Sequence, residues 1–224
     1  MKFNKYAIIV AGGSGTRMKS EIPKQFLEVG GIPILIRTIS QFKKADSAIQ
    51  VILVLPKSQF EFWEALKTKY NFDISYQLVS GGDSRFQSVR NGLNSIGNPE
   101  GLVAIHDGVR PFISEEIIRE SFRVTQAKTN AVVSVPLKDS IRFVDENGGN
   151  QAKPRSQYRS IQTPQTFQLS LLKQAFEVEE SNQFTDDATV FEHAGHKINL
   201  IEGSYRNIKI TTPEDLLLGE GFLI

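Results

Sequence analysis

Short apolar runs alternate with amphipathic stretches through the first 135 residues of this 224-residue chain. Four runs are rich in β-branched residues and nearly continuous, as parallel strands covered on both faces are: Tyr6–Val10, Gln50–Leu55, Leu102–Ile105 and Ala131–Val135. Between them, apolar residues recur at helical spacing, as in Ile34–Phe42 after Pro33 and in Phe60–Leu66. This alternation predicts an α/β fold of Rossmann-like type, with a mostly parallel twisted sheet and helices on both faces.

The alternation ends after Val135, where residues 138–160 form a different kind of segment. A few apolar residues and a strong turn signal, Asp145–Gly149, lead into a basic stretch. This pattern predicts a protruding β-arm, and a long solvated loop is the alternative. Because two strands alone are marginally stable in water, the arm is expected to pack against something else, such as a second subunit.

The last part of the chain returns to regular elements. Helices are expected near Leu169–Val178 and Asp187–Ala194, a strand at Ile198–Ile201, and a C-terminal helix that Thr212 caps. No internal repeat or low-complexity segment divides the sequence. The expected organisation is a single domain over residues 1–224, with the arm as part of it.

Composition narrows the possible functions. The net charge of +1 argues against a dedicated nucleic-acid surface. The absence of cysteine excludes disulfides, thiolate metal sites and cysteine nucleophiles. No apolar run approaches the ~18 residues that a membrane span needs, and the first run is too short for a signal peptide, so a cytoplasmic location is expected.

The segment directly after the first strand carries the clearest chemical signal. Ala11–Met18 places three glycines within four residues, and two cations follow, Arg17 and Lys24. Glycine lets a backbone turn sharply and present its N–H groups, so such a loop suits phosphate. It is neither a dinucleotide fingerprint nor a Walker loop, because Met18 stands where both need glycine. The alternative is an ordinary strand-to-helix turn with surface cations.

Three further loops carry polar clusters near expected strand ends, where ligands bind in parallel sheets. Ser80–Arg85 combines two glycines with an acid and is either a sugar or base contact or a plain turn. His106–Pro111 holds Asp107 and Arg110, which suit phosphate binding or pair with each other. Lys209, in a short β-branched run, is either an edge-strand charge or a site cation.

Two metal-site hypotheses are weaker. His193 and His196 have helical spacing, but Gly195 lies between them and no carboxylate completes a ligand set. Asp186 and Asp187 could contact a divalent ion, although an acid pair at a helix start is the favoured interpretation. A Ser–His–Asp triad lacks its nucleophile elbow.

Six segments along the whole chain, taken in order, carry a family likeness: Ala11–Met18, Pro23–Phe26, Gly81–Arg85, His106–Pro111, Gln162–Phe167 and Asn207–Thr211. Together they resemble the 2-C-methyl-D-erythritol 4-phosphate cytidylyltransferases of isoprenoid precursor synthesis. The resemblance implies transfer of a cytidylyl group from CTP, with Mg²⁺ carried mainly by the CTP phosphates. It also implies a homodimer whose arm reaches the neighbour's active site.

The resemblance further implies roles for individual residues. Arg17 and Lys24 match the cations that stabilise the transition state, and Arg155 and Lys209 match those that orient the attacking phosphate. The expected CTP contacts are Ala11, Gly12, Gly13, Gly81, Gly82, Asp83 and Ser88. The expected sugar-phosphate contacts are Asp107, Arg110, Ser140, Arg155 and Thr163. No protein metal ligand is implied.

This chemistry agrees with the residues present. A phosphate monoester is largely dianionic at neutral pH, so it needs charge neutralisation rather than a general base. Ribitol-5-phosphate cytidylyltransferases share most of these motifs and are the alternative, although Thr185–Thr189 and Phe191–Gly195 favour the erythritol branch. A non-catalytic sugar-nucleotide-binding protein is a further alternative, which retention of both Arg17 and Lys24 disfavours.

Overall fold

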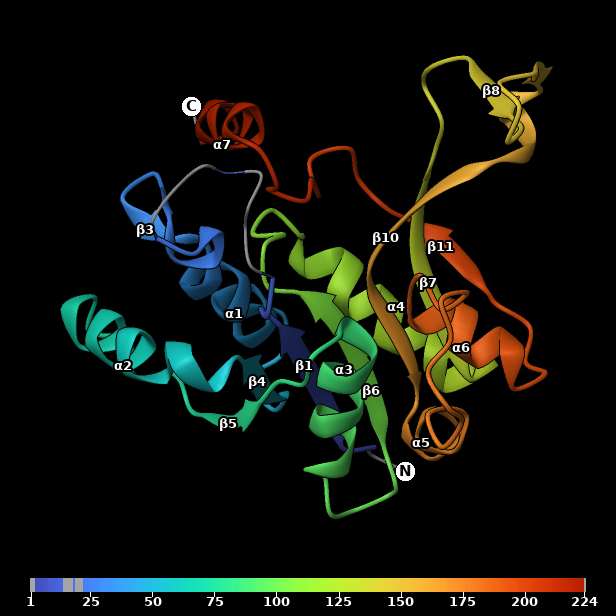
Figure 1. Ribbon diagram of the computed structural model, residues 1–224. Coiled ribbons are helices and arrows are strands. Elements are labelled where there is room, and N and C mark those ends of the chain that lie inside the picture. Colours follow the sequence, from blue (N-terminus) through green and yellow to red (C-terminus); the bar gives the residue numbers. More distant parts are fainter. Residues whose placement is uncertain (1–2, 14–17, 19–21, 224) are drawn as a thin grey trace.

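The computed structural model describes residues 3–13, 18 and 22–223. Within these residues a seven-stranded sheet runs through the molecule in the order β11-β7-β10-β6-β1-β4-β5 (Figure 1). Its strands are β1 (Lys5–Val10), β4 (Gln50–Leu55), β5 (Tyr76–Ser80), β6 (Leu102–Asp107), β7 (Asn130–Pro136), β10 (Arg159–Gln168) and β11 (Leu200–Glu202). β10 runs antiparallel to β6 and β7, and the other neighbours pair in parallel. The predicted mostly parallel α/β sheet is confirmed.

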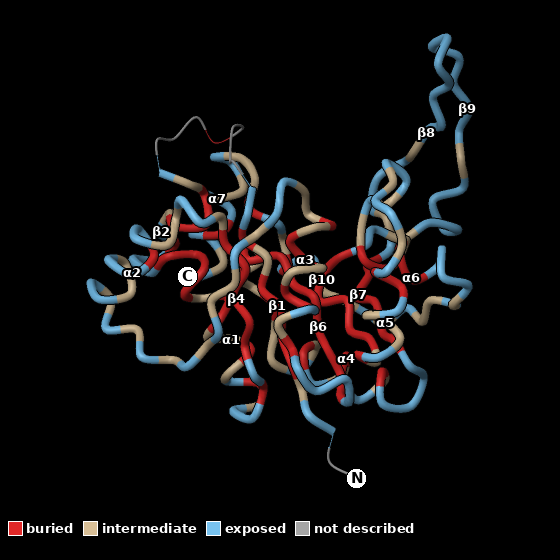
Figure 2. The backbone as a smooth tube through the Cα atoms, turned by 60° about the horizontal axis from the view of Figure 1, so that its bottom comes forward, coloured by how far each residue is buried: buried red, intermediate tan, exposed pale blue. Residues whose placement is uncertain are grey.

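Helices cover both faces of this sheet, because successive strand residues point to opposite sides. In β1, Tyr6 and Ile8 pack toward α3 (Arg85–Asn94), α5 (Leu169–Ala175) and α6 (Asp187–His193). Ala7 and Ile9 pack toward α1 (Ile34–Ala45), α2 (Phe60–Lys69) and α4 (Glu115–Lys128). Figure 2 shows the buried residues concentrated along the central strands between these two layers.

A third, smaller core holds the C-terminal segment against the body. It contains Val29 from the short pair β2 (Glu28–Val29) and β3 (Ile32–Pro33), together with Val109 and Ile210. The final helix α7 (Pro213–Gly221) begins directly after this segment. Its start is fixed by a capping box, in which Thr212 accepts from the N–H of Asp215 and Asp215 accepts from the N–H of Thr212. The segment that carries Lys209 is therefore anchored on both sides.

A separate hairpin follows β7 and stands away from the sheet (Figure 1). It consists of β8 (Ile141–Val144) and β9 (Asn150–Lys153), paired antiparallel around an Asp145–Gly149 turn. Its apolar residues are exposed: Phe143 keeps 57% and Val144 62% of its surface accessible. The hairpin occupies the part of the sequence in which the arm is expected.

Some elements differ from the sequence prediction. β10 is not predicted, because seven of its ten residues are polar; its Gln165 and Thr166 are buried and hydrogen-bonded to α6 and α4. The strand expected at Ile198–Ile201 lies at Leu200–Glu202. Lys209 is not in a strand, so its interpretation as an edge-strand charge is wrong.

Short 3₁₀ helices complete the chain at η2 (Lys24–Phe26), η3 (Lys57–Gln59) and η4 (Arg155–Gln157). Across the described residues, no helix has the length and apolar character that crossing a membrane would require.

Candidate active site

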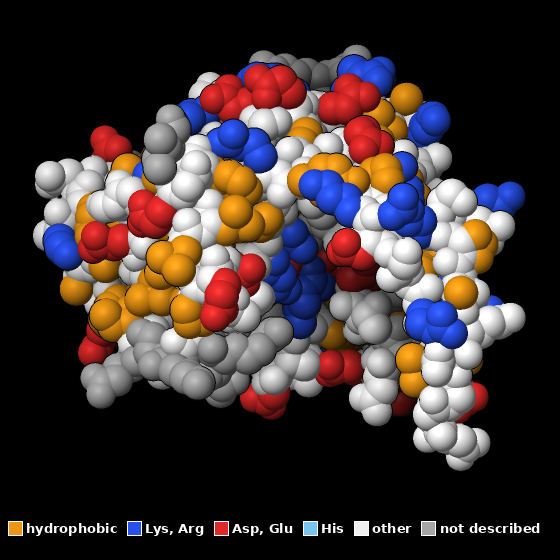
Figure 3. All heavy atoms as spheres, turned by 90° about the horizontal axis from the view of Figure 1, so that it is seen from above, with side chains coloured by type: hydrophobic (Ala, Val, Ile, Leu, Met, Phe, Trp, Pro, Cys, Tyr) orange, Lys and Arg blue, Asp and Glu red, His pale blue; other side chains and the backbone are white. Residues whose placement is uncertain are grey.

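A cavity of about 210 Å³ opens at the carboxyl ends of β1, β5 and β6. The chain leaves β1 first toward β4 and β5 and later returns to β6 on the other side of β1, so the cavity lies at the topological switch point. Seen from above, a hollow in this face contains Lys and Arg side chains (Figure 3). We call it the nucleotide cavity. Its polar and glycine lining is Gly12, Gly13, Lys24, Gln25, Gly82, Asp83, Ser84, Arg85, Ser88, Asp107 and Lys209.

Two glycine segments face each other across this cavity. Ser88 on α3 lies beside both: its Oγ is 3.9 Å from the place where a Cβ on Gly12 would lie, and it accepts from the N–H of Gly82 at 3.1 Å. A Cβ on Gly82 would lie 2.5 Å from Cβ of Gln87, so only glycine fits there. The loops after β1 and β5 thus leave room for a flat or phosphorylated ligand between them.

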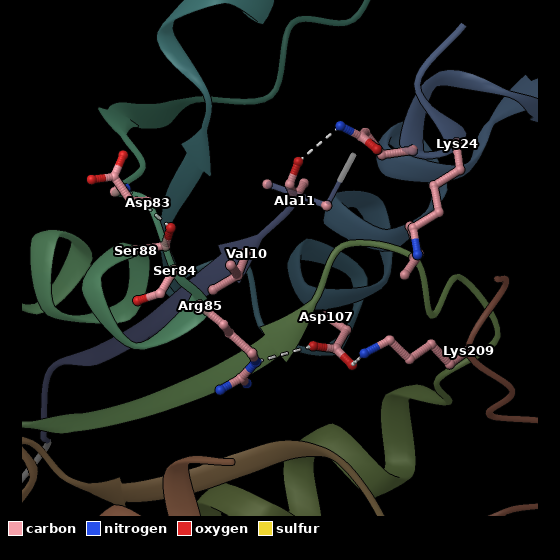
Figure 4. Close-up of a pocket in the computed structure, with 14 residues that line it drawn as sticks. Val10, Ala11, Lys24, Asp83, Ser84, Arg85, Ser88, Asp107 and Lys209 are labelled. Carbon is pink, nitrogen blue, oxygen red and sulfur yellow. Dashed lines mark hydrogen bonds and ion pairs between the residues drawn. The ribbon is translucent and has the colours of Figure 1, made fainter. Parts of the chain in front are cut away.

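Lys24 projects into the cavity from η2 (Figure 4). Its side chain passes close to Gly13, since Cε lies 3.6 Å from the Cβ position of that glycine. The neighbouring Gln25 is buried and donates from Nε2 to the carbonyl oxygen of Ala11 at 2.8 Å. This bond ties η2 to the glycine loop, so the cation and the loop keep a fixed relation.

Asp107 forms the opposite wall, at the end of β6. Its carboxylate lies 3.0 Å from Nζ of Lys209, 3.4 Å from Nε of Arg110 and 3.7 Å from Nε of Arg85. Burial alone would raise the pKa of Asp107, but these three cations overcome it and hold the pKa well below its ordinary range. Asp187 pairs with Arg85, so two carboxylates stand against three cations and this wall keeps a positive charge, which suits a polyanionic ligand.

His106 and Thr163 support Asp107 from behind. His106 is fully buried, and burial lowers its pKa to about 4, so the ring is neutral at pH 7. Nε2 lies 3.2 Å from the carbonyl oxygen of Arg110, which can only accept, so Nε2 carries the proton. The hydroxyl of Thr163 therefore donates to Nδ1 (3.0 Å) and accepts from the N–H of Asp107 (3.1 Å).

The buried ring of His106 predicts a pH-dependent stability. Its pKa rises from about 4 in the folded chain to ~6.5 on unfolding, so the unfolded state binds a proton first as the pH falls. Folding stability is therefore full above pH 6.5 and is lost between pH 6.5 and 4. Between pH 7.5 and 5 we expect the wild type to lose about 2 kcal/mol more than His106→Gln in urea unfolding. Parallel pH profiles for the two proteins would contradict the assignment.

A second cavity, of about 390 Å³, adjoins the first. Its charged lining is Arg110, Lys138 and Lys209 together with Asp139 and Asp215, and Gln162 and Ser160 add polar groups. Lys209 lines both cavities, so this residue lies at their boundary. We call this second space the acceptor cavity; the names of both cavities follow the ligands that the family resemblance predicts. Each cavity is lined by three cations and two acids, so each keeps a net positive charge that suits a phosphate-bearing ligand.

Comparison with known proteins identifies the family. The family model described as 2-C-methyl-D-erythritol 4-phosphate cytidylyltransferase, IspD, matches residues 6–224. The chain belongs to this family. The enzyme of that name from Phocaeicola vulgatus is 45% identical over 217 residues, which cover 97% of this chain and 98% of the relative. The one from Halalkalibacterium halodurans is 40% identical over 223 residues, covering 98% and 97%.

A solved structure agrees with this assignment. The 4-diphosphocytidyl-2C-methyl-D-erythritol synthase of Anaerococcus prevotii superposes with a TM-score of 0.85 at 31% identity, covering 99% of this chain and 96% of that one. The family resemblance read from the six segments is confirmed.

The structure brings most of the expected IspD site residues together. Those lining the nucleotide cavity are Ala11, Gly12, Gly13, Lys24, Gly82, Asp83, Ser88, Asp107 and Lys209. Gly81 lies next to them, and its N–H donates to Leu55 at 2.8 Å. Arg110 pairs with Asp107, which was one of the two alternatives for His106–Pro111. It also lines the acceptor cavity. Arg17 lies outside the described residues. These roles in an IspD site stay predictions.

Three residues that were expected to contact the sugar phosphate line neither cavity of this chain. Thr163 sits behind Asp107 with its hydroxyl engaged on both sides, so its contact with substrate stays a prediction. Ser140 and Arg155 are exposed on the hairpin segment and line neither cavity. Arg155 donates instead to the carbonyl oxygen of Lys138.

Arg85 and His106 stand in two of the segments that the sequence analysis singled out, but neither of them was assigned a role. Arg85 lines the nucleotide cavity, and its guanidinium also binds Asp187. Asp186 caps α6 and Asp187 begins it, so the favoured interpretation of this acid pair is confirmed. The signal for Arg85 was its place one turn before Ser88 on the same helix, which brings it to the same cavity. Among the residues that the structure describes, no group of three His, Asp or Glu could hold a metal ion.

Proposed function

We propose that this chain transfers a cytidylyl group from CTP to 2-C-methyl-D-erythritol 4-phosphate, which yields the CDP-linked product and pyrophosphate. Membership of the IspD family supports this reaction. The proposal rests on the position of Lys209, which lines both cavities and pairs with Asp107. An ammonium there meets both the nucleotide phosphate and the attacking phosphate.

The reaction requires charge neutralisation more than proton transfer. An oxygen of the acceptor phosphate attacks the α-phosphorus of CTP, the bond to the bridging oxygen breaks, and pyrophosphate leaves with the electron pair. Negative charge builds on the phosphoryl oxygens, where preorganised cations act strongly. Lys24, Gly12 and Gly13 line the nucleotide side, and Lys209 and Arg110 line the acceptor side. His106 is fully buried and both of its ring nitrogens are hydrogen-bonded within the protein, so it takes no part in proton transfer.

Mg²⁺ is part of the proposal. The carboxylates that line the nucleotide cavity are Asp83 and Asp107, and Asp107 already has cationic partners. This donor set fits an ion that keeps mostly phosphate oxygens and waters as ligands, with Asp83 as the available protein carboxylate. When bound, Mg²⁺ would neutralise charge on the CTP phosphates. A cytoplasmic location stays a prediction.

The proposal is tested by pyrophosphate release from CTP and Mg²⁺ with one acceptor at a time. Release with methylerythritol phosphate is expected. Release with ribitol 5-phosphate alone would favour the ribitol-5-phosphate cytidylyltransferases, and release with neither would favour a non-catalytic sugar-nucleotide-binding protein. Omission of Mg²⁺ in the presence of a chelator separates the metal requirement from the acceptor preference.

We also infer that the arm acts in a second copy of the chain. The hairpin exposes Phe143 and Val144, and Arg155 at its base lies outside both cavities of its own chain. A two-fold dimer could bring the arm of one copy to the cavities of the other. This arrangement would supply the Arg155 and Ser140 contacts that the family resemblance implies.

Mixing two inactive variants tests this arrangement. If Lys24 acts in its own chain and Arg155 in the neighbour's site, each mixed dimer has one intact site. A 1:1 mixture of Lys24→Ala and Arg155→Ala, unfolded and refolded together, should then regain about a quarter of wild-type turnover by random pairing. Turnover no higher than the mean of the separate variants would show that both residues serve the same chain, and sedimentation would report the dimer itself.

A further inference from the structure

Half-buried Arg85, in the lining of the nucleotide cavity, forms an ion pair with buried Asp187. Arg85 is the first residue of α3 and lines the cavity, whereas Asp187 is the first residue of α6 and is completely buried. Nη1 and Nη2 of Arg85 donate to the two carboxylate oxygens of Asp187 at 2.8 and 2.7 Å. Two parallel bonds of this kind fix the plane and the direction of a guanidinium group.

The position of Asp187 is itself fixed by backbone contacts. Asp186 caps α6 by accepting from the N–H of Thr189 at 2.9 Å. Gln165 on β10 donates to Asp186 at 2.8 Å and accepts from the N–H of Ala188 at 2.8 Å. The start of α6 is therefore tied to the central sheet. Asp187 presents its carboxylate to Arg85 from a rigid base.

The remaining nitrogen of Arg85 faces the active-site carboxylate. Its Nε lies 3.7 Å from Oδ1 of Asp107, which is longer than a hydrogen bond. The other oxygen, Oδ2, lies 3.0 Å from Nζ of Lys209. Figure 4 shows Asp107 between Arg85 on one side and Lys209 on the other. The order Asp187, Arg85, Asp107, Lys209 is thus a chain of alternating charges that ends at the boundary of the two cavities.

Removal of the negative charge of Asp187 should change how the remaining charged side chains pair. Without the Asp187 carboxylate, two N–H donors of Arg85 would be unpaired, with Asp107 as the nearest acid. Guanidinium groups favour bidentate carboxylates, so Arg85 would turn to Asp107 and compete with Lys209 for it. With Arg110 included, the cluster holds two carboxylates and three cations; the variant would hold one carboxylate and the same cations.

We propose that Asp187 is a positioning residue of this transferase, which holds Arg85 back from Asp107 and so leaves Asp107 to orient the ammonium of Lys209. The inference rests on the proposed function, because Lys209 is taken to meet the reacting phosphates. Asp187 itself lines neither cavity. It affects the position of Lys209 only through its contact with Arg85 and the contact of Arg85 with Asp107.

A double-mutant cycle on kcat tests the proposal. Asp187→Asn keeps the size of the side chain and should lower kcat about tenfold at saturating substrates. In a Lys209→Ala background the same substitution should change kcat less than about twofold, because the group it acts through is gone. Glu192→Gln is the matched control: it removes an exposed acid from the same helix and leaves the contacts that fix Asp187 in place. Its kcat should stay near that of the wild type.

Two results would overturn the proposal: an equal loss from Asp187→Asn in both backgrounds, or a loss no larger than that of the Glu192→Gln control. Each protein is first checked by urea unfolding. Should Asp187→Asn not fold, Arg85→Lys replaces it, since lysine keeps the charge but cannot form the bidentate pair with Asp187, and the same dependence on Lys209 is expected. Inactivity of the wild type with CTP and both acceptors would instead refute the proposed function.

Discussion

Replacement of Lys24 by alanine is expected to lower kcat by roughly 10²–10³, as loss of a single well-placed donor to a developing oxyanion does. Lys24 is only 9% exposed, and its side chain runs along Gly13 into the nucleotide cavity. Gln25 holds η2 to the glycine loop, so the ammonium is placed before CTP binds. Because the charge on the phosphoryl oxygens is greatest in the transition state, kcat should fall more than KM for CTP rises.

The chain contains a close control for this substitution. Lys57 also follows a proline and begins a 3₁₀ helix, η3, but it is exposed and lines neither cavity. Lys57→Ala should therefore leave both kcat and KM near their wild-type values. Pyrophosphate release measured for both variants, with unfolding curves to show intact folds, decides the matter. Near-normal turnover of Lys24→Ala would show that Lys24 does not stabilise the transition state.

The sheet and its covering helices were predictable because burial on both faces leaves a strong signal. Strands such as β1 and β4 are apolar and β-branched throughout, which is typical of central parallel strands. β10 lacks that signal, although it lies at the centre of the sheet beside β6. Its polar residues are accommodated because Gln165 and Thr166 find partners on α6 and α4. Such pairing depends on distant elements, and no local pattern reveals it.

The site was predictable to the extent that its residues cluster in motifs. The glycine loop, Lys24 and Asp107 follow strand ends, and the switch-point rule places all of them in one cavity. The link from Asp107 to Asp187 was not predictable, because 80 residues separate them and Arg85 joins them from a third element. The neutral state of His106 likewise depends on complete burial, which its own neighbours in sequence do not show.

Asp107→Asn is expected to lower the free energy of unfolding by about 3 kcal/mol, at the lower end of the range for removing one partner from a buried ion pair. The side chain keeps its shape, so the loss is electrostatic rather than a cavity effect. Arg85 would still have Asp187, and Arg110 would still donate to the carbonyl oxygen of Asn207 at 2.8 Å. Lys209, which is 41% exposed, can turn toward water. Because all three cations keep a partner or contact water, the loss of unfolding free energy should lie at the lower end of that range.

The pH dependence of the stability difference between wild type and Asp107→Asn shows whether the loss comes from the charge of Asp107 or from its packing. Because three cations hold the pKa of Asp107 below its ordinary value, its contribution is full above the unfolded carboxyl pKa of ~3.9 and is lost as the pH falls through the lower folded pKa. The difference between wild type and Asp107→Asn should thus stay constant from pH 5 to 8 and shrink in stronger acid. Asp73→Asn, at an exposed site, should change stability by less than about 0.5 kcal/mol.

Turnover of the same variant shows which role of Asp107 dominates. If the carboxylate serves as the counterion that orients Lys209, kcat and stability fall together, and kcat stays low at temperatures where the variant is fully folded. If it serves folding alone, kcat of the folded fraction equals that of the wild type. The first result is expected, since Asp107 bonds Lys209 at the boundary of the two cavities, where a displaced ammonium would leave the attacking phosphate without its partner.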